Sequence, residues 1–260
     1  MSRRITARAM ATPARALTAI ELPRAIGEIA ATRLLRRRLH QLPVGDQHGV
    51  MVLPGFLSDD RFNTPLRNYL DQLGYRSTGW GQGVNLGPTK IPIEVAAEAA
   101  CEHAERTGGR ISLVGHSLGG IYAREIAKLY PDIIRQVITL GSPFSRAKEP
   151  KNFAGKLFRR FNPDVERLDE SEQYGVAPPH PTSAIYTRLD GVIGWGLSVQ
   201  KAGHDRCENI EVRGSHCGLT HNAAVWYVLA DRLAQNHEQW QPFARQGWRN
   251  WIYPPAFSGS

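Results

Sequence analysis

The sequence predicts an α/β fold in which helices cover both faces of a mostly parallel sheet. Apolar runs at 49–53, 110–114 and 137–140 have the length and composition of fully buried strands. Helical patterns, such as the alanine-rich segment 93–106, alternate with these runs. Strands that alternate with helices are typical of parallel sheets, and 260 residues are enough for one large core.

The elements follow in order along the chain. A helix is expected from Pro23 to about Leu39, because proline suits the first turn of a helix. Its apolar residues fall near one face, namely Leu22, Ile26, Ile29 and Ala30. Strands are expected at 49–53, 75–80, 110–114, 137–140, 183–187 and 208–213, and helices at about 64–73, 93–106, 118–129 and 219–235. In such sheets ligands bind beyond the carboxyl ends of the strands.

The positive charge of the chain is concentrated at its start. Residues 1–40 contain nine Arg and two Glu, so they carry +7 of the +8 net charge. Two interpretations stay open: a solvated basic helix, or a helix that contacts an anionic membrane surface. No nucleic-acid partner is expected, because the segment has no aromatic side chains on which bases could stack.

Targeting signals and cysteines also restrict the expected function. No apolar run has the length of a signal peptide or a membrane-spanning helix, so we expect a cytoplasmic protein that is at most peripheral to the membrane. Cys207 and Cys217 flank a predicted strand whose ends lie roughly 20 Å apart, so we expect free thiols. No zinc-binding spacing is present, and no metal or other cofactor is expected.

The segment Gly115-His116-Ser117-Leu118-Gly119 matches the motif G-x-S-x-G. It joins a predicted buried strand to a predicted helix, which is the context that this motif requires. In such a sharp turn the serine hydroxyl is exposed, and glycines avoid collisions with neighbouring backbone. Ser117 is therefore the candidate nucleophile.

A serine hydroxyl needs a base that takes its proton, and the imidazole needs an acid that orients it. His216 directly follows the last predicted strand and is the favoured base, with His221 as the alternative and His204 placed at the wrong end of its strand. Asp190 follows the strand 183–187 and is the favoured acid. The weaker candidates are Asp132, Asp164, Asp169, Glu170 and Asp205.

A tetrahedral intermediate needs two backbone N–H donors for its oxyanion. The residue after the nucleophile, Leu118, supplies one at the start of its helix. The loop after the first buried strand, Pro54-Gly55-Phe56, supplies the other candidate, which is Phe56 N–H.

Together these motifs resemble bacterial lipases and esterases of the α/β-hydrolase superfamily over residues 48 to 236. The resemblance rests on Leu53-Pro54-Gly55-Phe56, the turn from Gly115 to Gly120, Gly141-Ser142-Pro143, Asp190-Gly191 and Ser215-His216. It implies hydrolysis of carboxylic esters of acyl or lipid-like substrates through an acyl-serine intermediate. Many relatives have His-Gly where this chain has Pro54-Gly55, which leaves the second oxyanion donor open.

Two further features complete the prediction. Residues 1–40 are expected to form a basic, partly helical arm, and 41–260 a single α/β-hydrolase domain with a lid insertion at about 145–181. The spacing of Phe153, Leu157 and Phe161 predicts a short helix with one apolar face, either a mobile lid or an ordinary surface helix. The alternatives to an esterase or lipase are an acyltransferase with the same acyl-serine, and a non-catalytic membrane-associated scaffold.

Overall fold

The computed structural model describes residues 9, 12–39, 42–144, 153–163, 176–200, 203–236 and 239–257. Its centre is a six-stranded sheet with the strand order β2-β1-β3-β4-β5-β6. The strands are β1 (Gly49–Leu53), β2 (Arg76–Gly79), β3 (Ile111–His116), β4 (Ile134–Leu140), β5 (Thr182–Tyr186) and β6 (Cys207–Glu211). All neighbouring strands pair in parallel, so the predicted sheet is confirmed.

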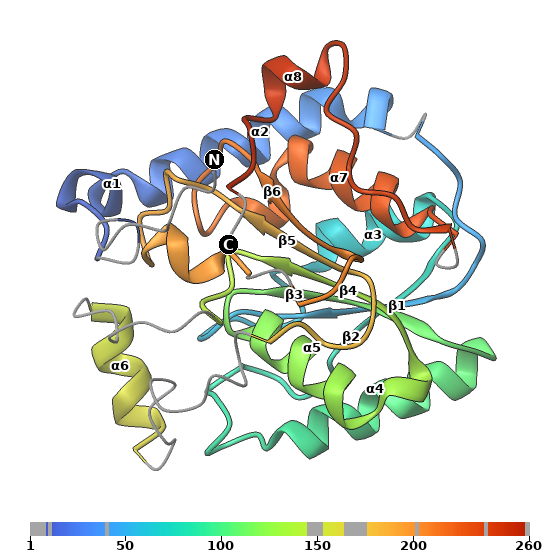
Figure 1. The fold of residues 1–260 in the computed structure, drawn as a ribbon. Helices are drawn as coiled ribbons and strands as arrows, with labels where there is room; N and C mark the ends of the chain where they lie inside the picture. The colour runs from blue at the N-terminus through green and yellow to red at the C-terminus, as the bar shows by residue number, and fades with distance from the viewer. Residues whose placement is uncertain are drawn as a thin grey trace.

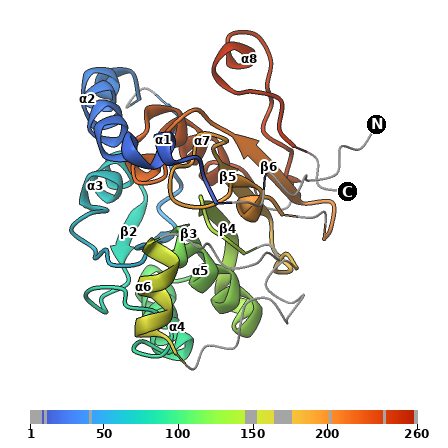
Figure 2. The same cartoon turned by 90° about the vertical axis from the view of Figure 1, so that its left-hand side faces the viewer.

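Helices cover both faces of this sheet (Figure 1). The α-helices are α1 (Arg15–Ala19), α2 (Glu21–Leu39), α3 (Thr64–Gln72), α4 (Ile93–Thr107), α5 (Leu118–Leu129), α6 (Phe153–Phe161), α7 (Ala223–Leu233) and α8 (Arg249–Ile252). Short 3₁₀ turns are η1 (Pro131–Ile133), η3 (Trp195–Ser198) and η4 (Leu219–His221). The helices α4 and α5 lie on one face, and α3 and α7 lie on the other (Figure 2).

The central strands are buried on both faces, which is why they read as continuous apolar runs. In β1, Val50 and Val52 pack into the core with α3 and α7, whereas Met51 and Leu53 pack into the core with α4 and α5. This alternation follows from the two-residue period of a strand. The core therefore has two layers, and the sheet between them places the ends of β1, β3, β4, β5 and β6 around the site described below.

The last predicted helix, 219–235, is divided in two. Its first residues form η4, and α7 begins only after Asn222. The Asn222 side chain accepts hydrogen bonds from Ala224 N at 2.9 Å and Val225 N at 3.3 Å. This N-cap fixes the start of α7, because it satisfies amide groups that have no partner inside the helix. His221 consequently lies in η4, whereas the sequence pattern had placed it in the helix.

Helix α2 packs beside α7 and η4. The face that it turns toward them is not the apolar face noted in the sequence. Leu22 and Ile26, on the apolar face expected from the sequence, are 66% and 67% exposed. The buried positions include the polar residues Glu21 and Thr32. No helix among the described ranges is long and apolar enough to cross a membrane.

The short helix expected within 145–181 is α6, whose Phe158 packs against the core formed with α4 and α5. Phe158 and Phe161 of α6 contact Phe56 edge to face, with ring centroids 5.4 Å and 6.1 Å apart. Of the predicted apolar face at 153, 157 and 161, only Phe161 makes one of these ring contacts, and the side chain of Phe153 lies outside the described part of the chain.

Candidate active site

Ser117 occupies the turn between β3 and α5 in a strained backbone conformation. Its φ is +51° and its ψ is −119°, in a region that residues with a side chain rarely adopt. Ser117 N donates to Leu140 O at 2.8 Å, which ties the turn to the end of β4. The strain is therefore held in place by the sheet, and the candidate nucleophile stands at the carboxyl end of β3.

Glycine is required on both sides of Ser117 because the backbone comes very close to its neighbours. A Cβ atom on Gly115 would overlap the backbone of Gly119 and Gly120. A Cβ atom on Gly119 would overlap the carbonyl of Leu53 at the end of β1. The glycines of the motif thus allow α5 to start directly above the sheet.

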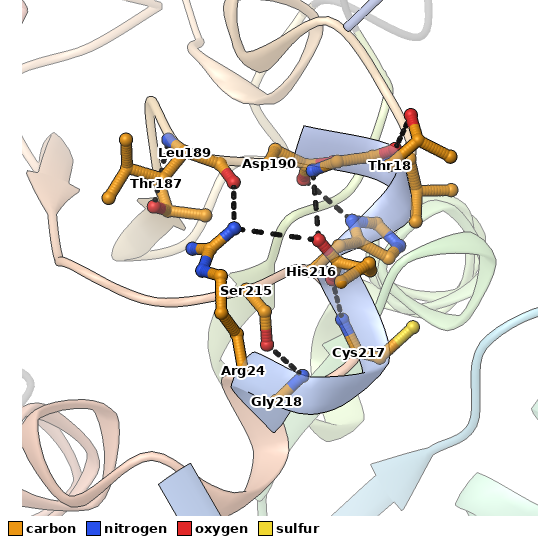
Figure 3. Close-up of polar contacts among 12 residues, drawn as sticks. Thr18, Arg24, Thr187, Leu189, Asp190, Ser215, His216, Cys217 and Gly218 are labelled. Carbon is orange, nitrogen blue, oxygen red and sulfur yellow. Dashed lines mark hydrogen bonds and ion pairs between the residues drawn. The ribbon is translucent and has the colours of Figure 1, made fainter. Parts of the chain in front are cut away.

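His216 and Asp190 meet beyond the carboxyl ends of β6 and β5 (Figure 3). His216 Nδ1–H donates to Asp190 Oδ2 at 2.7 Å, and the two residues are 4% and 3% exposed. The second oxygen, Asp190 Oδ1, accepts from Val192 N at 2.8 Å and from Ile193 N at 2.7 Å. The carboxylate is thereby fixed, and it fixes the imidazole with Nε2 as the nitrogen that can accept a proton.

The loop of His216 lies directly beside the turn of Ser117. His116 Nε2–H donates to the backbone carbonyl of His216 at 2.9 Å, and the two imidazole rings are 5.1 Å apart. Ser117 Oγ forms no hydrogen bond with another described residue. The structure thus brings the candidate base and the candidate acid into contact and places the loop of His216 next to the turn of Ser117.

Burial and charge act in opposite directions on the two histidines. Burial lowers the pKa of His216, but the charge and hydrogen bond of Asp190 and the charge of Glu21 outweigh it, so that the pKa is raised. Burial, together with repulsion from His216, lowers the pKa of His116 to about 3. At neutral pH His116 is therefore a neutral donor to the His216 carbonyl, and His216 is the more basic of the two.

The two oxyanion candidates flank Ser117. Phe56 follows Gly55, and a Cβ atom on Gly55 would lie 3.2 Å from Ser117 Cβ. Neither Phe56 N nor Leu118 N donates to another described residue, so both amides can donate to a ligand's oxygen. The side chain of Asn85 holds this loop by donating to Pro54 O at 2.8 Å, a role that no motif indicated.

The alternative acids and bases lie elsewhere. His221 Nδ1 pairs with Thr220 Oγ1 at 2.9 Å, and its ring packs on Phe62. His204 Nε2 bonds to Pro178 O at 2.8 Å, near the amino end of β6. Asp132 lies in η1, before β4, and Asp205 lies before β6. The remaining candidates, Asp164, Asp169 and Glu170, fall outside the described residues.

No cluster suited to a metal ion competes with this site in the part of the chain that the structure describes. No group of three or more His, Cys, Asp or Glu side chains is arranged there to hold a metal ion. A cavity of about 390 Å³ lies between α2 and α3, with Arg33, Tyr69 and Trp226 in its lining. None of Ser117, Asp190 and His216 lines it. The three cysteines are free, as expected.

Sequence reasoning missed the carboxylates and the guanidinium that α2 contributes next to the site. Glu21 Oε1 accepts from Cys217 N at 2.8 Å, and Glu28 Oε1 accepts from Ser215 N at 2.6 Å. Arg24 Nη1 donates to Leu189 O at 2.8 Å. No motif marks these residues, because each acts on the backbone of a segment more than 150 positions further along the chain.

Comparison with known protein families finds one match within the chain. Residues 96–177, less than half of the chain, match the family described as PGAP1-like alpha/beta domain. This segment includes β3, the turn of Ser117, α5 and β4. No curated protein sequence matches the chain.

Several solved structures share the fold at low sequence identity. Aspergillus fumigatus lipase B superposes with a TM-score of 0.60 and 15% identity over 74% of this chain and 53% of that chain. This chain thus spans about half the length of that lipase. Paleococcus ferrophilus monoacylglycerol lipase superposes with a TM-score of 0.53 and 15% identity over 73% of this chain and 96% of the lipase. The thioesterase domain from the curacin biosynthetic pathway superposes with a TM-score of 0.51 and 15% identity over 75% of this chain and 93% of that domain. These likenesses confirm the α/β-hydrolase fold.

Proposed function

We propose that this chain is a serine hydrolase that cleaves carboxylic esters of acyl or lipid-like substrates. Ser117 is the nucleophile, His216 the general base and Asp190 the acid that orients it. One observation carries the proposal: the strained Ser117 follows His116, which hydrogen-bonds to the backbone of the buried His216, and the His216 imidazole is bonded through Nδ1–H to the buried carboxylate of Asp190. A fold by itself does not assign chemistry, so the proposal depends on these side chains.

In the first half of the reaction Ser117 Oγ attacks the ester carbonyl carbon. His216 Nε2 takes the hydroxyl proton as the new C–O bond forms, and Asp190 stabilises the resulting imidazolium. The carbonyl oxygen becomes an oxyanion that accepts hydrogen bonds from the amides of Phe56 and Leu118. Collapse breaks the ester C–O bond, and His216 returns its proton to the departing alkoxide, which leaves as an alcohol.

In the second half a water molecule attacks the acyl-serine. His216 Nε2 takes a proton from this water, the same two amides hold the second oxyanion, and collapse releases the carboxylic acid. The proton on His216 then returns to Ser117 Oγ. The same acyl-serine would serve an acyltransferase if an alcohol or thiol replaced the water.

The position of α6 supports an apolar acyl group as part of the substrate. Its Phe158 and Phe161 rings lie against Phe56, whose amide is the second oxyanion candidate. Asn162, next to the end of α6, donates to Leu86 O at 2.8 Å and accepts from Thr89 N at 3.1 Å. We propose that α6 belongs to a lid that covers the acyl chain and excludes water during the reaction.

Hydrolysis of p-nitrophenyl esters from short to long acyl chains tests this function. We expect turnover with the wild type and none with Ser117→Ala, whose circular dichroism should match that of the wild type. Asp190→Asn should reduce kcat by roughly 10²- to 10⁴-fold, because the imidazole loses its orienting carboxylate.

The acyl-chain optimum then separates an esterase from a lipase. Absence of turnover in folded wild-type protein across the series would contradict the hydrolase, and transfer to an added alcohol or thiol would favour the acyltransferase. Equal turnover in Ser117→Ala would remove Ser117 from the nucleophile role.

We further propose that the outer side of α2 contacts an anionic membrane surface. Leu22, Ile26, Arg33 and Arg37 lie close to one line along the helix, and all four are exposed. Apolar and cationic side chains on one exposed helix face are suited to the boundary between anionic headgroups and acyl chains.

A further inference from the structure

The inner side of α2 lies against the two loops that carry the base and the acid. Asp190 lies in the loop after β5, and His216 lies in the loop after β6. Figure 3 shows α2 passing beside both loops, with the Arg24 side chain directed at Leu189. The two loops hydrogen-bond to each other through the pair of Asp190 and His216, so α2 is a third element that fixes their relative position.

Glu21 connects the two loops directly. Its Oε1 accepts from Cys217 N at 2.8 Å, and its Oε2 accepts from Gly191 N at 3.1 Å. These amides belong to the residues that follow His216 and Asp190. One carboxylate thus holds the backbone next to the base and the backbone next to the acid at the same time.

Two more side chains of α2 hold the residues that come just before the base and the acid. Glu28 Oε1 accepts from Ser215 N at 2.6 Å, and Arg24 Nη1 donates to Leu189 O at 2.8 Å. Arg24 Nη2 also donates to the carbonyl of Gly214. Each of the two site residues is therefore held by α2 on both sides along the chain.

The side chains of α2 pack closely against these loops. A Cβ atom on Gly191 would overlap the Glu21 carboxylate, and a Cβ atom on Gly218 would overlap the Glu28 carboxylate. Glu21 itself is 4% exposed. A carboxylate is costly to bury unless it is hydrogen-bonded, and here the amides that bond to it are those of the site loops.

We propose that Glu21 is a positioning residue of the active site, which fixes His216 and Asp190 relative to each other by holding the backbone of both loops, and that Arg24 and Glu28 assist it in holding these loops. The inference rests on the proposed function for its catalytic meaning. It extends the site to a segment that no sequence motif and no family match includes.

The charges around His216 support an electrostatic role for Glu21. The ionisable groups that act on or contact His216 are Asp190 from the β5 loop, Glu21 from α2 and His116 from β3; Arg24 acts on Glu21, and Glu28 acts on the neighbouring Cys217. Burial lowers the pKa of His216, and the charges of Asp190 and Glu21 raise it. Burial and the charge of Asp190 raise the pKa of Glu21, and the Cys217 amide and the charges of His216 and Arg24 only partly offset this, so that the pKa lies above its usual value.

Glu21→Gln tests the proposal, because it keeps the shape of the side chain and removes the charge. We expect kcat for an ester substrate to fall about ten-fold or more with little change in KM, because imidazolium formation is less stabilised. The acidic limb of kcat/KM against pH should move to lower pH, and so should the NMR titration of the His216 imidazole. Glu21→Asp keeps the charge and should return both titrations toward the wild type.

Two control variants lie on the same helix. Arg38→Gln, which is exposed on α2 outside the face proposed to contact the membrane, should match the wild type in every measurement. Glu28→Gln should lower kcat but leave the acidic limb in place, because Glu28 holds backbone without adding to the charge that acts on His216.

A folded Glu21→Gln variant with wild-type kcat and an unmoved His216 titration would overturn the proposal. So would a loss of activity that is fully explained by a smaller folded fraction, with the His216 titration unchanged in the folded part. If the wild type hydrolyses no ester, the proposed function fails, but the His216 titration in Glu21→Gln still decides whether Glu21 acts on the imidazole.

Discussion

The helices α2 and α6 are both basic and both lie outside the two main layers of helices, yet the side-chain contacts described above for them differ in kind. The inner side of α2 is charged and polar, and its attachments are hydrogen bonds to backbone groups of the site loops. The ring contacts of α6 are apolar: Phe158 and Phe161 each pack against Phe56.

The two kinds of contact suit different functions near a catalytic site. Hydrogen bonds to buried backbone groups are directional and expensive to break, so they fix a geometry. Contacts between aromatic rings tolerate sliding and replacement by another apolar surface. In our account α2 therefore belongs to the fixed part of the site, and α6 belongs to the part that exchanges its contacts for an acyl chain.

Removal of both carboxylates of α2 should have the largest effect. Glu21→Ala with Glu28→Ala leaves the amides of Gly191, Ser215 and Cys217 without their acceptors. We expect the free energy of unfolding to fall by about 2 to 5 kcal/mol, measured in urea, because unpaired buried amides are costly. A loss below about 0.5 kcal/mol, the range of ordinary surface substitutions, would show that water replaces these acceptors without cost and would break the comparison.

Loss of one aromatic contact of α6 should have a smaller effect on stability. Phe158→Ala removes a ring contact with Phe56, so we expect a loss of about 1 kcal/mol in urea unfolding. Turnover of long-chain p-nitrophenyl esters should fall by roughly ten-fold, because the lid holds the acyl chain less well. Hydrolysis of the acetate ester should change much less.

The matched control on α6 is the exposed Lys156→Ala, which should leave both rates unchanged. If Phe158→Ala slows the acetate and the long-chain esters equally, α6 supports the loop of Phe56 and not the acyl chain.

A partly exposed carboxylate outside both helices gives the scale for the buried ones. Asp46 accepts from Arg135 Nη1 at 2.6 Å and bonds to His48, while its side chain is 51% exposed. Burial raises its pKa, but the bonds to His48 and Arg135 outweigh this and lower it from 3.8 to about 2. This carboxylate therefore adds stability above pH about 4, which is lost as the pH falls toward about 2.

Because solvent screens this pair, we expect Asp46→Asn to cost about 1 kcal/mol or less at neutral pH. The difference from the wild type should shrink as urea unfolding is repeated at lower pH. A loss as large as that of the α2 double variant would remove the distinction between buried and exposed carboxylates.

The smallest effect on stability is expected from the outer side of α2. Leu22→Ser with Ile26→Ser changes two exposed side chains, so the free energy of unfolding should stay within about 0.5 kcal/mol of the wild type. Binding to phosphatidylserine vesicles should weaken, with phosphatidylcholine vesicles as the control. Unchanged binding, or none in the wild type, would contradict the proposed membrane contact.

The sequence predicted the sheet and the turn of Ser117 because both leave local signals. Buried parallel strands read as apolar runs, and a strand-to-helix turn around a serine requires glycines at fixed spacing. The spacing also placed His216 and Asp190 directly after strands, and the structure brings these two side chains into contact. The division of the final helix was missed, although Asn222 is a common N-cap residue.

The role of α2 could not be predicted because it depends on contacts with residues that are distant in the sequence. The helix buries Glu21 and Thr32 and exposes Leu22 and Ile26, which reverses the expected pattern. The polar side of α2 is buried because its carboxylates accept hydrogen bonds from backbone amides of the site loops. Those loops come more than 150 residues later in the chain. Likewise, the periodicity of residues 153, 157 and 161 did not indicate that Phe158 of α6 contacts Phe56.

The most direct test of the account is covalent labelling of Ser117. Wild-type protein and Ser117→Ala would be treated with a fluorophosphonate, which reacts with activated serine hydroxyls, and each would be analysed by intact mass and peptide mapping. We expect one adduct per wild-type chain, located on Ser117, and none on Ser117→Ala. An unlabelled wild type, or equal labelling of both proteins, would contradict the claim that His216 and Asp190 activate this serine.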